Sequence, residues 1–315
     1  MSPMTAGVDR RVLALLVAAI ALPLMLQAAG QPYYVGFVSR VMIFALVASS
    51  LNLLVGFGGL VSFGHAAFFG IGAYAVGILA QHGVVSALAA WPLAVAASGV
   101  AALLIGVISL RTRGLYFIMI TLAFAQMLYY LFISLKAYGG DDGINLAERS
   151  VLPGTGVPGD VAFYYVVLAC LAGALWLLHR LLASRFGAVM SGIRENETRM
   201  EALGYPTFRY RLACFILGGA AAGLAGALMV NQNGFVSPNL LHWTQSGQLL
   251  IMVILGGIRS PWGGAVGAAT FLLLEEVLSG FTEHWSLGVG VVLLLVVLRA
   301  PHGITGLLSG RSRAA

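Results

Sequence analysis

Long apolar runs separated by short polar segments follow one another along most of the chain. The runs are continuously apolar and close to the roughly 20 residues that a helix needs to cross a bilayer, whereas the strands of a membrane barrel would be shorter and would alternate. About ten spans are expected from this pattern, at residues 12–29, 37–57, a glycine-broken run to about residue 80, 85–110, 115–135, 161–182, 213–230, 249–258, 263–278 and 286–298. The run 249–258 is short for a crossing, which indicates a tilted or broken helix. The sequence predicts an all-α, polytopic membrane protein with a single membrane domain over residues 1–315.

The first run has a second interpretation. Arg10 and Arg11 precede it and Ala28 and Ala29 end it, and a cleaved signal peptide has the same order of basic residues, apolar core and small residues. Because many further spans follow, a retained first helix is the favoured prediction.

The polar segment 184–212 carries the densest charge between the runs. Its charged residues are Arg185, Arg194, Arg199, Arg209, Arg211, Glu195, Glu197 and Glu201. On a helical wheel Ile193, Met200 and Leu203 fall near one side, and Gly204 and Pro206 then end the helix. The segment is therefore either an amphipathic helix that lies in a groove on a soluble partner or a solvated loop with orienting arginines.

Composition and charge support a membrane protein. Apolar residues make up 60% of the sequence, charged residues 9%, and mean hydropathy is +0.94, whereas about a quarter of the residues in soluble domains are charged. The net charge of +6 comes from arginines between the spans, where they orient helices, so no nucleic-acid partner is expected. With a cytoplasmic amino terminus, 14 of the 17 basic residues would face the cytoplasm: Arg10, Arg11, Arg111, Arg113, Arg180, Arg185, Arg194, Arg199, Arg209, Arg211, Arg259, Arg299, Arg311 and Arg313. Both termini and the segment 184–212 are predicted to be cytoplasmic.

Candidate enzymatic residues are sparse. The one lysine, Lys136, has no P-loop around it, so the chain is not expected to hydrolyse ATP by that route. The six histidines are scattered, and Cys170 and Cys214 lie within apolar runs, so no metal site is predicted. An ion-coupled carrier would use ionisable groups within the membrane, for which Glu275, Glu276, Arg40 and His65 are the candidates. The first three lie near the ends of apolar runs, so their side chains are explained more simply as reaching the membrane interface.

The stretch 52–74 is dense in glycine and carries polar residues within an apolar run. Its six glycines would weaken a regular helix, and Asn52, Ser62 and His65 are costly at that depth unless they face protein or water. Either a broken helix beside a permeation path or close helix packing explains it. Residues 256–260 faintly echo residues 58–62, which is weak support for a repeat.

A series of blocks in order along the chain resembles one transporter family. The blocks are 52–74, 113–117, 121–124, 139–144, 186–187, 193–197, 202–204, 220–228, 237–238, 253–257 and 301–304. They resemble the membrane subunits of ATP-binding cassette (ABC) importers for branched-chain amino acids, specifically the LivM-type subunit.

The resemblance implies an ABC importer permease fold in which the cytoplasmic segment forms a coupling helix against an ATPase. The residues assigned to that coupling are Ile193, Arg194, Glu195, Glu197, Arg199, Met200, Glu201, Ala202, Leu203 and Gly204. It also implies a homologous companion permease, two ATP-binding cassette subunits that bind the ATP, and a periplasmic binding protein. The chain itself is expected to need no cofactor. Segment 201–204 is shorter than the acidic-to-glycine pattern of other ABC importers, so the resemblance assigns Glu201 to the coupling helix without the contact role of that pattern's glutamate.

The sequence thus predicts a multi-pass permease subunit of the bacterial inner membrane that imports leucine, isoleucine and valine. Its predicted translocation path comprises Asn52, Gly56, Gly58, Ser62, Gly64, His65, Tyr116 and Thr121. An importer for urea or short amides would share every block quoted, and an ion-coupled secondary carrier is the further alternative.

Overall fold

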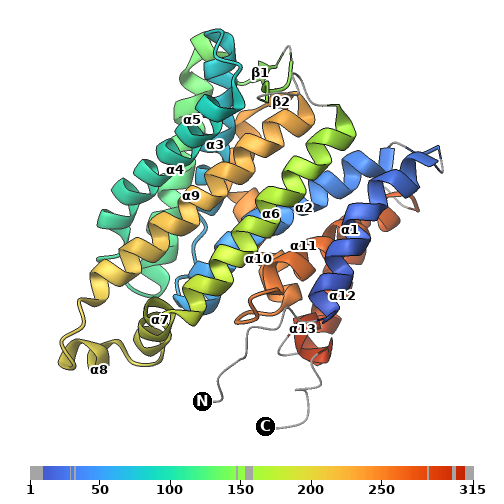
Figure 1. Cartoon of the computed structure of the whole chain (residues 1–315). Helices are drawn as coiled ribbons and strands as arrows, with labels where there is room; N and C mark the ends of the chain where they lie inside the picture. The colour runs from blue at the N-terminus through green and yellow to red at the C-terminus, as the bar shows by residue number, and fades with distance from the viewer. Residues whose placement is uncertain are drawn as a thin grey trace.

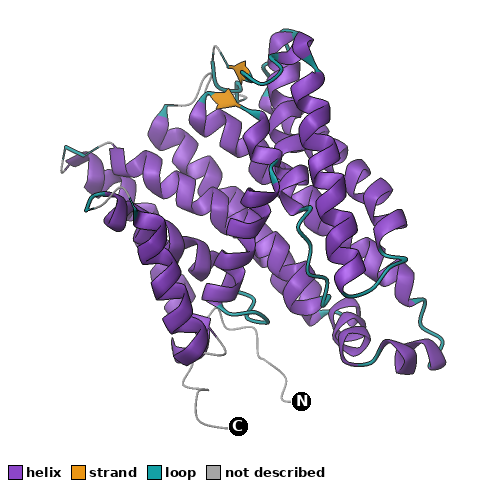
Figure 2. Cartoon of the chain, turned by 180° about the vertical axis from the view of Figure 1, so that it is seen from behind, coloured by secondary structure: helices purple, strands orange, loops and turns teal. Residues whose placement is uncertain are grey.

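The computed structural model describes residues 10–28, 30–31, 33–146, 148–152, 159–281, 284–299 and 303–308. In this part of the chain helices dominate, as predicted for an all-α protein (Figures 1 and 2). The α-helices are α1 (Arg10–Ala28), α2 (Tyr33–Asn52), α3 (His65–Gln81), α4 (Ala87–Ser109), α5 (Leu115–Ser134), α6 (Asp160–Ala183), α7 (Arg185–Glu195), α8 (Glu197–Ala202), α9 (Thr207–Asn233), α10 (Trp243–Gly256), α11 (Gly263–Ser279), α12 (Trp285–Arg299) and α13 (Gly303–Leu308). The short elements are the π-helical turn η1 (Leu53–Phe57), the 3-10 turns η2 (Lys136–Tyr138) and η3 (Pro238–Leu241), and the strands β1 (Ile144–Asn145) and β2 (Phe235–Val236).

Helix α9 lies at the centre of the bundle, packed along its length against α3 and α4. Small residues allow the close approach: a β-carbon at Gly72 would lie 2.5 Å from the Gly223 Cα, and one at Gly219 would lie 2.5 Å from the Ala102 Cβ. Glycines at such crossings let backbones touch where lipid provides no hydrophobic drive for association. The glycine richness of the sequence is therefore used in part for helix packing.

A second group of helices surrounds α2, which contacts α6, α9, α10 and α11. Helix α1 lies beside α6, where the Tyr164 and Tyr165 hydroxyls donate to the carbonyls of Ala19 and Ile20 at 2.8 and 3.0 Å. The retained first helix and the cleaved signal peptide both remain predictions.

Five stretches among the described residues are long and apolar enough to cross a membrane: 33–57, 87–109, 115–134, 160–183 and 207–233. Shorter apolar helices occupy 18–27, 65–81 and 286–296. Helix α10 has 14 residues, as the short run 249–258 indicated. The expected number of about ten spans remains a prediction.

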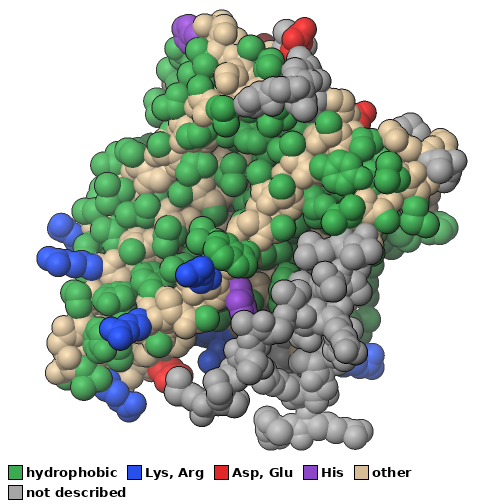
Figure 3. Space-filling view, in the orientation of Figure 1, with side chains coloured by type: hydrophobic (Ala, Val, Ile, Leu, Met, Phe, Trp, Pro, Cys, Tyr) green, Lys and Arg blue, Asp and Glu red, His purple; other side chains and the backbone are tan. Residues whose placement is uncertain are grey.

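The two ends of the bundle differ in character. At one end β1 and β2 form an antiparallel ribbon in which Ile144 pairs with Val236; at the opposite end lie α7, α8 and α13 (Figure 1). In the visible face, apolar side chains cover the flank, and Lys and Arg gather toward the α7 and α8 end (Figure 3). We refer to these as the β1–β2 end and the arginine-rich end.

The prediction of one amphipathic helix in segment 184–212 is wrong in detail. Asn196 adopts an extended backbone (φ −157°, ψ 97°) that ends α7 and starts α8, and its side chain accepts a hydrogen bond from the Arg199 amide at 2.9 Å. An Asn side chain competes for the helix amides in this way, which favours a cap over a continued helix. Ile193 is consequently buried on α7, whereas Leu203 is 67% exposed beyond α8.

The predicted helix stop at Gly204 is confirmed, and the arginines that follow it belong to the next helix. Gly204 has φ +84°, the left-handed conformation expected of a glycine that follows a helix. Helix α9 then begins at Thr207, so Arg209 and Arg211 belong to its first turns and not to a separate loop.

Candidate functional site

The chain leaves regular helix where α2 would otherwise continue into α3. Helix α2 ends at Asn52, η1 follows, residues 58–64 are irregular, and α3 begins at His65. In η1 the Gly58 amide donates to the Leu53 carbonyl at 3.1 Å, across five residues as in a π-helix. The broken-helix prediction is confirmed for this segment, which we call the α2–α3 break (residues 53–64). Gly70 and Gly72 lie in regular α3, where close packing is the correct explanation.

Three buried hydroxyl groups satisfy backbone amides at the start of α3. The hydrogen bonds are Gly64 N to Ser62 Oγ at 3.1 Å, Phe63 N to Thr121 Oγ1 at 3.3 Å and Ala66 N to Ser246 Oγ at 2.9 Å. The three hydroxyl residues are 0% exposed. Buried backbone amides need acceptors, and the first amides of a helix, such as that of Ala66, have none within the helix, so burying this start requires such hydroxyl groups. These side chains hold the break inside the bundle.

His65 is fully buried beside the same cluster. Its Nε2 lies 2.8 Å from the Ser50 Oγ, and the Ser50 hydroxyl donates to the Val47 carbonyl at 2.7 Å. Ser50 has only one hydroxyl hydrogen and uses it in the bond to Val47, so the His65 Nε2 carries a hydrogen and donates to the Ser50 Oγ. The ring packs edge-on against Phe68 at 6.0 Å between centroids. His65 therefore packs α3 against α2.

A second break, between α10 and α11 at residues 257–262, lies against the first. The Asn52 Nδ2 donates to the Ser260 carbonyl at 2.7 Å, and a β-carbon at Gly56 would lie 3.0 Å from the Arg259 amide nitrogen. From α13, the Thr305 hydroxyl donates to the Gly256 carbonyl at 2.8 Å. The segments 58–62 and 256–260 that echo one another in sequence thus both lie at helix ends, and the two breaks meet through Asn52.

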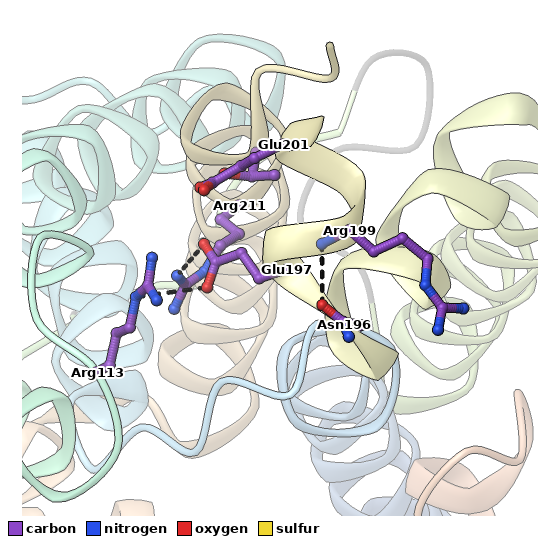
Figure 4. A network of polar contacts seen from close by, with 7 residues as sticks. Arg113, Asn196, Glu197, Arg199, Glu201 and Arg211 are labelled. Carbon is purple, nitrogen blue, oxygen red and sulfur yellow. Dashed lines mark hydrogen bonds and ion pairs between the residues drawn. The ribbon is translucent and has the colours of Figure 1, made fainter. Parts of the chain in front are cut away.

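At the arginine-rich end, Glu197 ties α8 to the rest of the bundle (Figure 4). Its carboxylate lies 2.9 Å from the Arg211 Nη1 on α9 and 3.4 Å from the Arg113 Nε in the α4–α5 turn. Glu201 accepts a hydrogen bond from the Thr207 hydroxyl at 2.9 Å. These two carboxylates, predicted to serve coupling, hold the chain's own helices in place.

The turn from α8 to α9 leaves apolar side chains exposed on the protein surface. Leu203 is 67% exposed, Tyr205 40% and Phe208 38%. Such side chains on a charged end, held by the ion pairs above, form a surface suited to a protein partner. We call it the α8–α9 surface.

Arg194 joins the arginine-rich end to the α2–α3 break. Its guanidinium donates from Nη1 to the Gly56 carbonyl. Burial and the neighbouring Arg259 lower the pKa of Arg194 from its ordinary value, and Glu195 opposes that shift. One of the predicted coupling residues therefore touches one of the predicted path residues directly.

Comparison with known proteins assigns the chain to a family. The family described as branched-chain amino acid transport system / permease component matches residues 33–298. The chain belongs to this permease family. The match begins at the start of α2, so both breaks and helices α7 and α8 lie within the permease region.

Curated relatives of the chain include subunits of two kinds. The high-affinity branched-chain amino acid transport system permease protein LivM of Salmonella typhimurium is 29% identical over 93% of this chain and 73% of its own length. LivM of Escherichia coli K12 is 28% identical over 92% of this chain and 73% of its own. LivH of the same organism is 28% identical over 46% of each chain. No solved structure gives a significant match.

The structure brings most of the predicted path residues of this permease together and leaves one apart. Tyr116 is 74% exposed on α5, whereas Thr121, further along the same helix, is buried at the break. Of the intramembrane ionisable candidates, Arg40 and Glu275 lie 3.7 Å apart as an ion pair between α2 and α11, and Glu276 accepts from the Tyr33 hydroxyl at 3.2 Å. The path assignment itself remains a prediction.

Sequence reasoning missed Ser50 and Ser246, which complete the cluster around the start of α3. Both serines lie in or beside apolar runs, and only the fold places them near His65 and Ala66. Among the described residues, no group of three His, Cys, Asp or Glu side chains is placed to hold a metal ion.

Replacing Ser246 with alanine is expected to lower the free energy of unfolding by about 1–3 kcal/mol, because the buried Ala66 amide loses its acceptor. Thermal unfolding in detergent measures the change. Ser134→Ala is the matched control, since that exposed hydroxyl bonds only within its own helix in the described structure. Equal midpoints for the two variants would contradict the capping role of Ser246.

Proposed function

We propose that this chain is one membrane subunit of an ABC importer that carries leucine, isoleucine and valine across the bacterial inner membrane. A periplasmic binding protein delivers the amino acid, two ATPase chains supply the energy, and a homologous permease completes the path. The observation that carries the proposal is similarity to LivM permeases over 93% of the chain. Partial similarity to LivH, a second permease of branched-chain amino acid transport, supports a heterodimer of related subunits.

The arginine-rich end supports a coupling role for α7 and α8. In this proposal the arginines face the cytoplasm, as the distribution of basic residues predicts, and the α8–α9 surface docks on an ATPase chain. Leu203, Tyr205 and Phe208 supply apolar contact there. Glu197 and Glu201 hold α8 in position through their contacts with α9. The path follows the α2–α3 break, and Tyr116 takes part by facing the companion subunit.

The rival functions differ from this one in measurable ways. An ion-coupled carrier would use an unpartnered acid within the membrane, whereas Glu275 is paired with Arg40 and Glu276 accepts a hydrogen bond from Tyr33. An importer of urea or short amides would need the same ATPase chains and would differ in the ligand it carries.

Uptake of labelled leucine by proteoliposomes tests the function. The assembled importer is expected to take up leucine only with ATP and binding protein, and the purified chain alone is expected to take up none under an ion gradient. Competition by excess isoleucine and valine, but not by urea or acetamide, is expected. Uptake by the chain alone would overturn the proposal in favour of a secondary carrier. Competition by amides alone would show that the importer carries urea or short amides and not branched-chain amino acids.

Replacing Leu203 with aspartate is expected to weaken ATPase association at least tenfold, because a charge is placed in the apolar contact of the α8–α9 surface. Co-purification and binding measurements in detergent report the change. Asn145→Asp adds a similar charge at an exposed position of β1, at the other end of the bundle, and is expected to leave association unchanged. Wild-type association of the Leu203 variant would show that the ATPase docks elsewhere.

A further inference from the structure

We infer that Arg194 is a positioning residue that transmits movement of α7 and α8 directly to the α2–α3 break, by holding the Gly56 carbonyl. The inference rests on the proposed function, since it concerns how ATPase docking reaches the path. In this inference, movement of α7 and α8 reaches the α2–α3 break without movement of whole membrane spans, because the Arg194 side chain already connects α7 to the break.

The π-helical turn makes the Gly56 carbonyl available. In an α-helix this carbonyl would accept from the amide four residues later, which belongs to Leu60. Here the Leu60 amide donates instead to the Leu54 carbonyl at 2.9 Å. The Gly56 carbonyl has thus lost its α-helical donor, and the Arg194 guanidinium supplies one. A charge-assisted bond of this kind is stronger than the amide bond it replaces.

Gly59 leaves room for the Arg194 side chain, and Gly58 leaves room for Met190 one turn earlier on α7. A β-carbon at Gly59 would lie 3.1 Å from the Arg194 Cγ, and one at Gly58 would lie 3.4 Å from the Met190 Cε on the same face of α7. Gly59 also has φ +66°, a conformation that favours glycine. Val189, Met190 and Ile193 are buried, so α7 is seated firmly and its displacement must carry Arg194 with it.

The contact is linked to the second break as well. Gly56 lies against the Arg259 backbone, and Asn52, one helical turn earlier, donates to the Ser260 carbonyl. A pull on the Gly56 carbonyl therefore acts on both breaks at once. The nearby Arg259 carries the same charge as Arg194 and lowers the pKa of Arg194.

The test is the number of leucine molecules taken up per ATP hydrolysed by the assembled importer. Arg194→Met keeps the length of the side chain without a donor and is expected to lower this ratio at least tenfold, with ATPase association unchanged. Arg194→Lys retains a single-point donor and is expected to give an intermediate ratio. Arg185→Met, which removes an exposed arginine from the first turn of the same helix, is the control and is expected to match the wild type.

A wild-type ratio in Arg194→Met would overturn the inference, because the contact would then be a passive anchor. Loss of ATPase association in Arg194→Met would also overturn it, because Arg194 would then act on the partner and not on the break. If Arg194→Met does not fold, Arg194→Lys decides: a lowered ratio with normal association supports the inference, and a wild-type ratio removes it. Failure of the proposed function is distinct, since wild-type protein would then show no ATP-dependent leucine uptake.

Discussion

Gly72→Ala is expected to disrupt the central crossing of α3 and α9 and to lower the free energy of unfolding by about 3 kcal/mol or more. The added β-carbon would lie 2.5 Å from the Gly223 Cα and 2.6 Å from its carbonyl carbon. Both neighbours are backbone atoms, so no side chain can turn away, and the helices must separate. The yield of monodisperse protein in detergent and its thermal unfolding midpoint measure the effect.

Gly99→Ala is the matched control for this change. It makes the same substitution within a neighbouring membrane helix, where the new β-carbon would lie 3.7 Å from the Ala220 Cβ, an ordinary contact distance. We expect wild-type yield and stability, because helix propensity changes equally in both variants. A Gly72 variant as stable as the Gly99 variant would show that the crossing tolerates a wider separation.

Glu197→Gln is expected to release α8 from the bundle and to reduce leucine uptake by the assembled importer at least tenfold. Helix α8 has six residues, none of them buried, so polar contacts contribute much of its anchoring, and the charged ones are the ion pairs of Glu197 with Arg211 and Arg113. The Arg211 side chain is only 10% exposed, and removing the carboxylate leaves that charge with a neutral partner. The expected loss of stability is about 2 kcal/mol.

Limited proteolysis of segment 196–206 tests this prediction independently of transport. Cleavage is expected to be faster in the Glu197 variant, because a loosened α8 opens its backbone to the protease. Asp142→Asn, which removes an exposed carboxylate from the loop between η2 and β1, is expected to give the wild-type pattern. If both variants are cleaved alike and Glu197→Gln transports normally, packing of Met200 against Gly192 must suffice to hold α8.

The sequence alone predicted the long apolar helices, because the length and apolar character of a membrane span are properties of consecutive residues. The run 115–135 became α5 at Leu115–Ser134, and the run 161–182 became α6 at Asp160–Ala183. The concentration of glycine with Asn52, Ser62 and His65 indicated either a break or close helix packing, since local backbone preference and the cost of buried polar groups both oppose a regular, lipid-facing helix there.

Only the tertiary structure decided which partners those residues have. Nothing near Gly56 in the sequence indicates Arg194, and nothing near Ala66 indicates Ser246, since 138 and 180 residues separate these pairs. The same holds for Glu197, whose charge suggested an outward contact but which binds Arg211 and Arg113 within the chain. A hydrogen bond or ion pair depends on the placement of whole helices against one another, and that placement arises from packing across the bundle and not from the pattern along one segment.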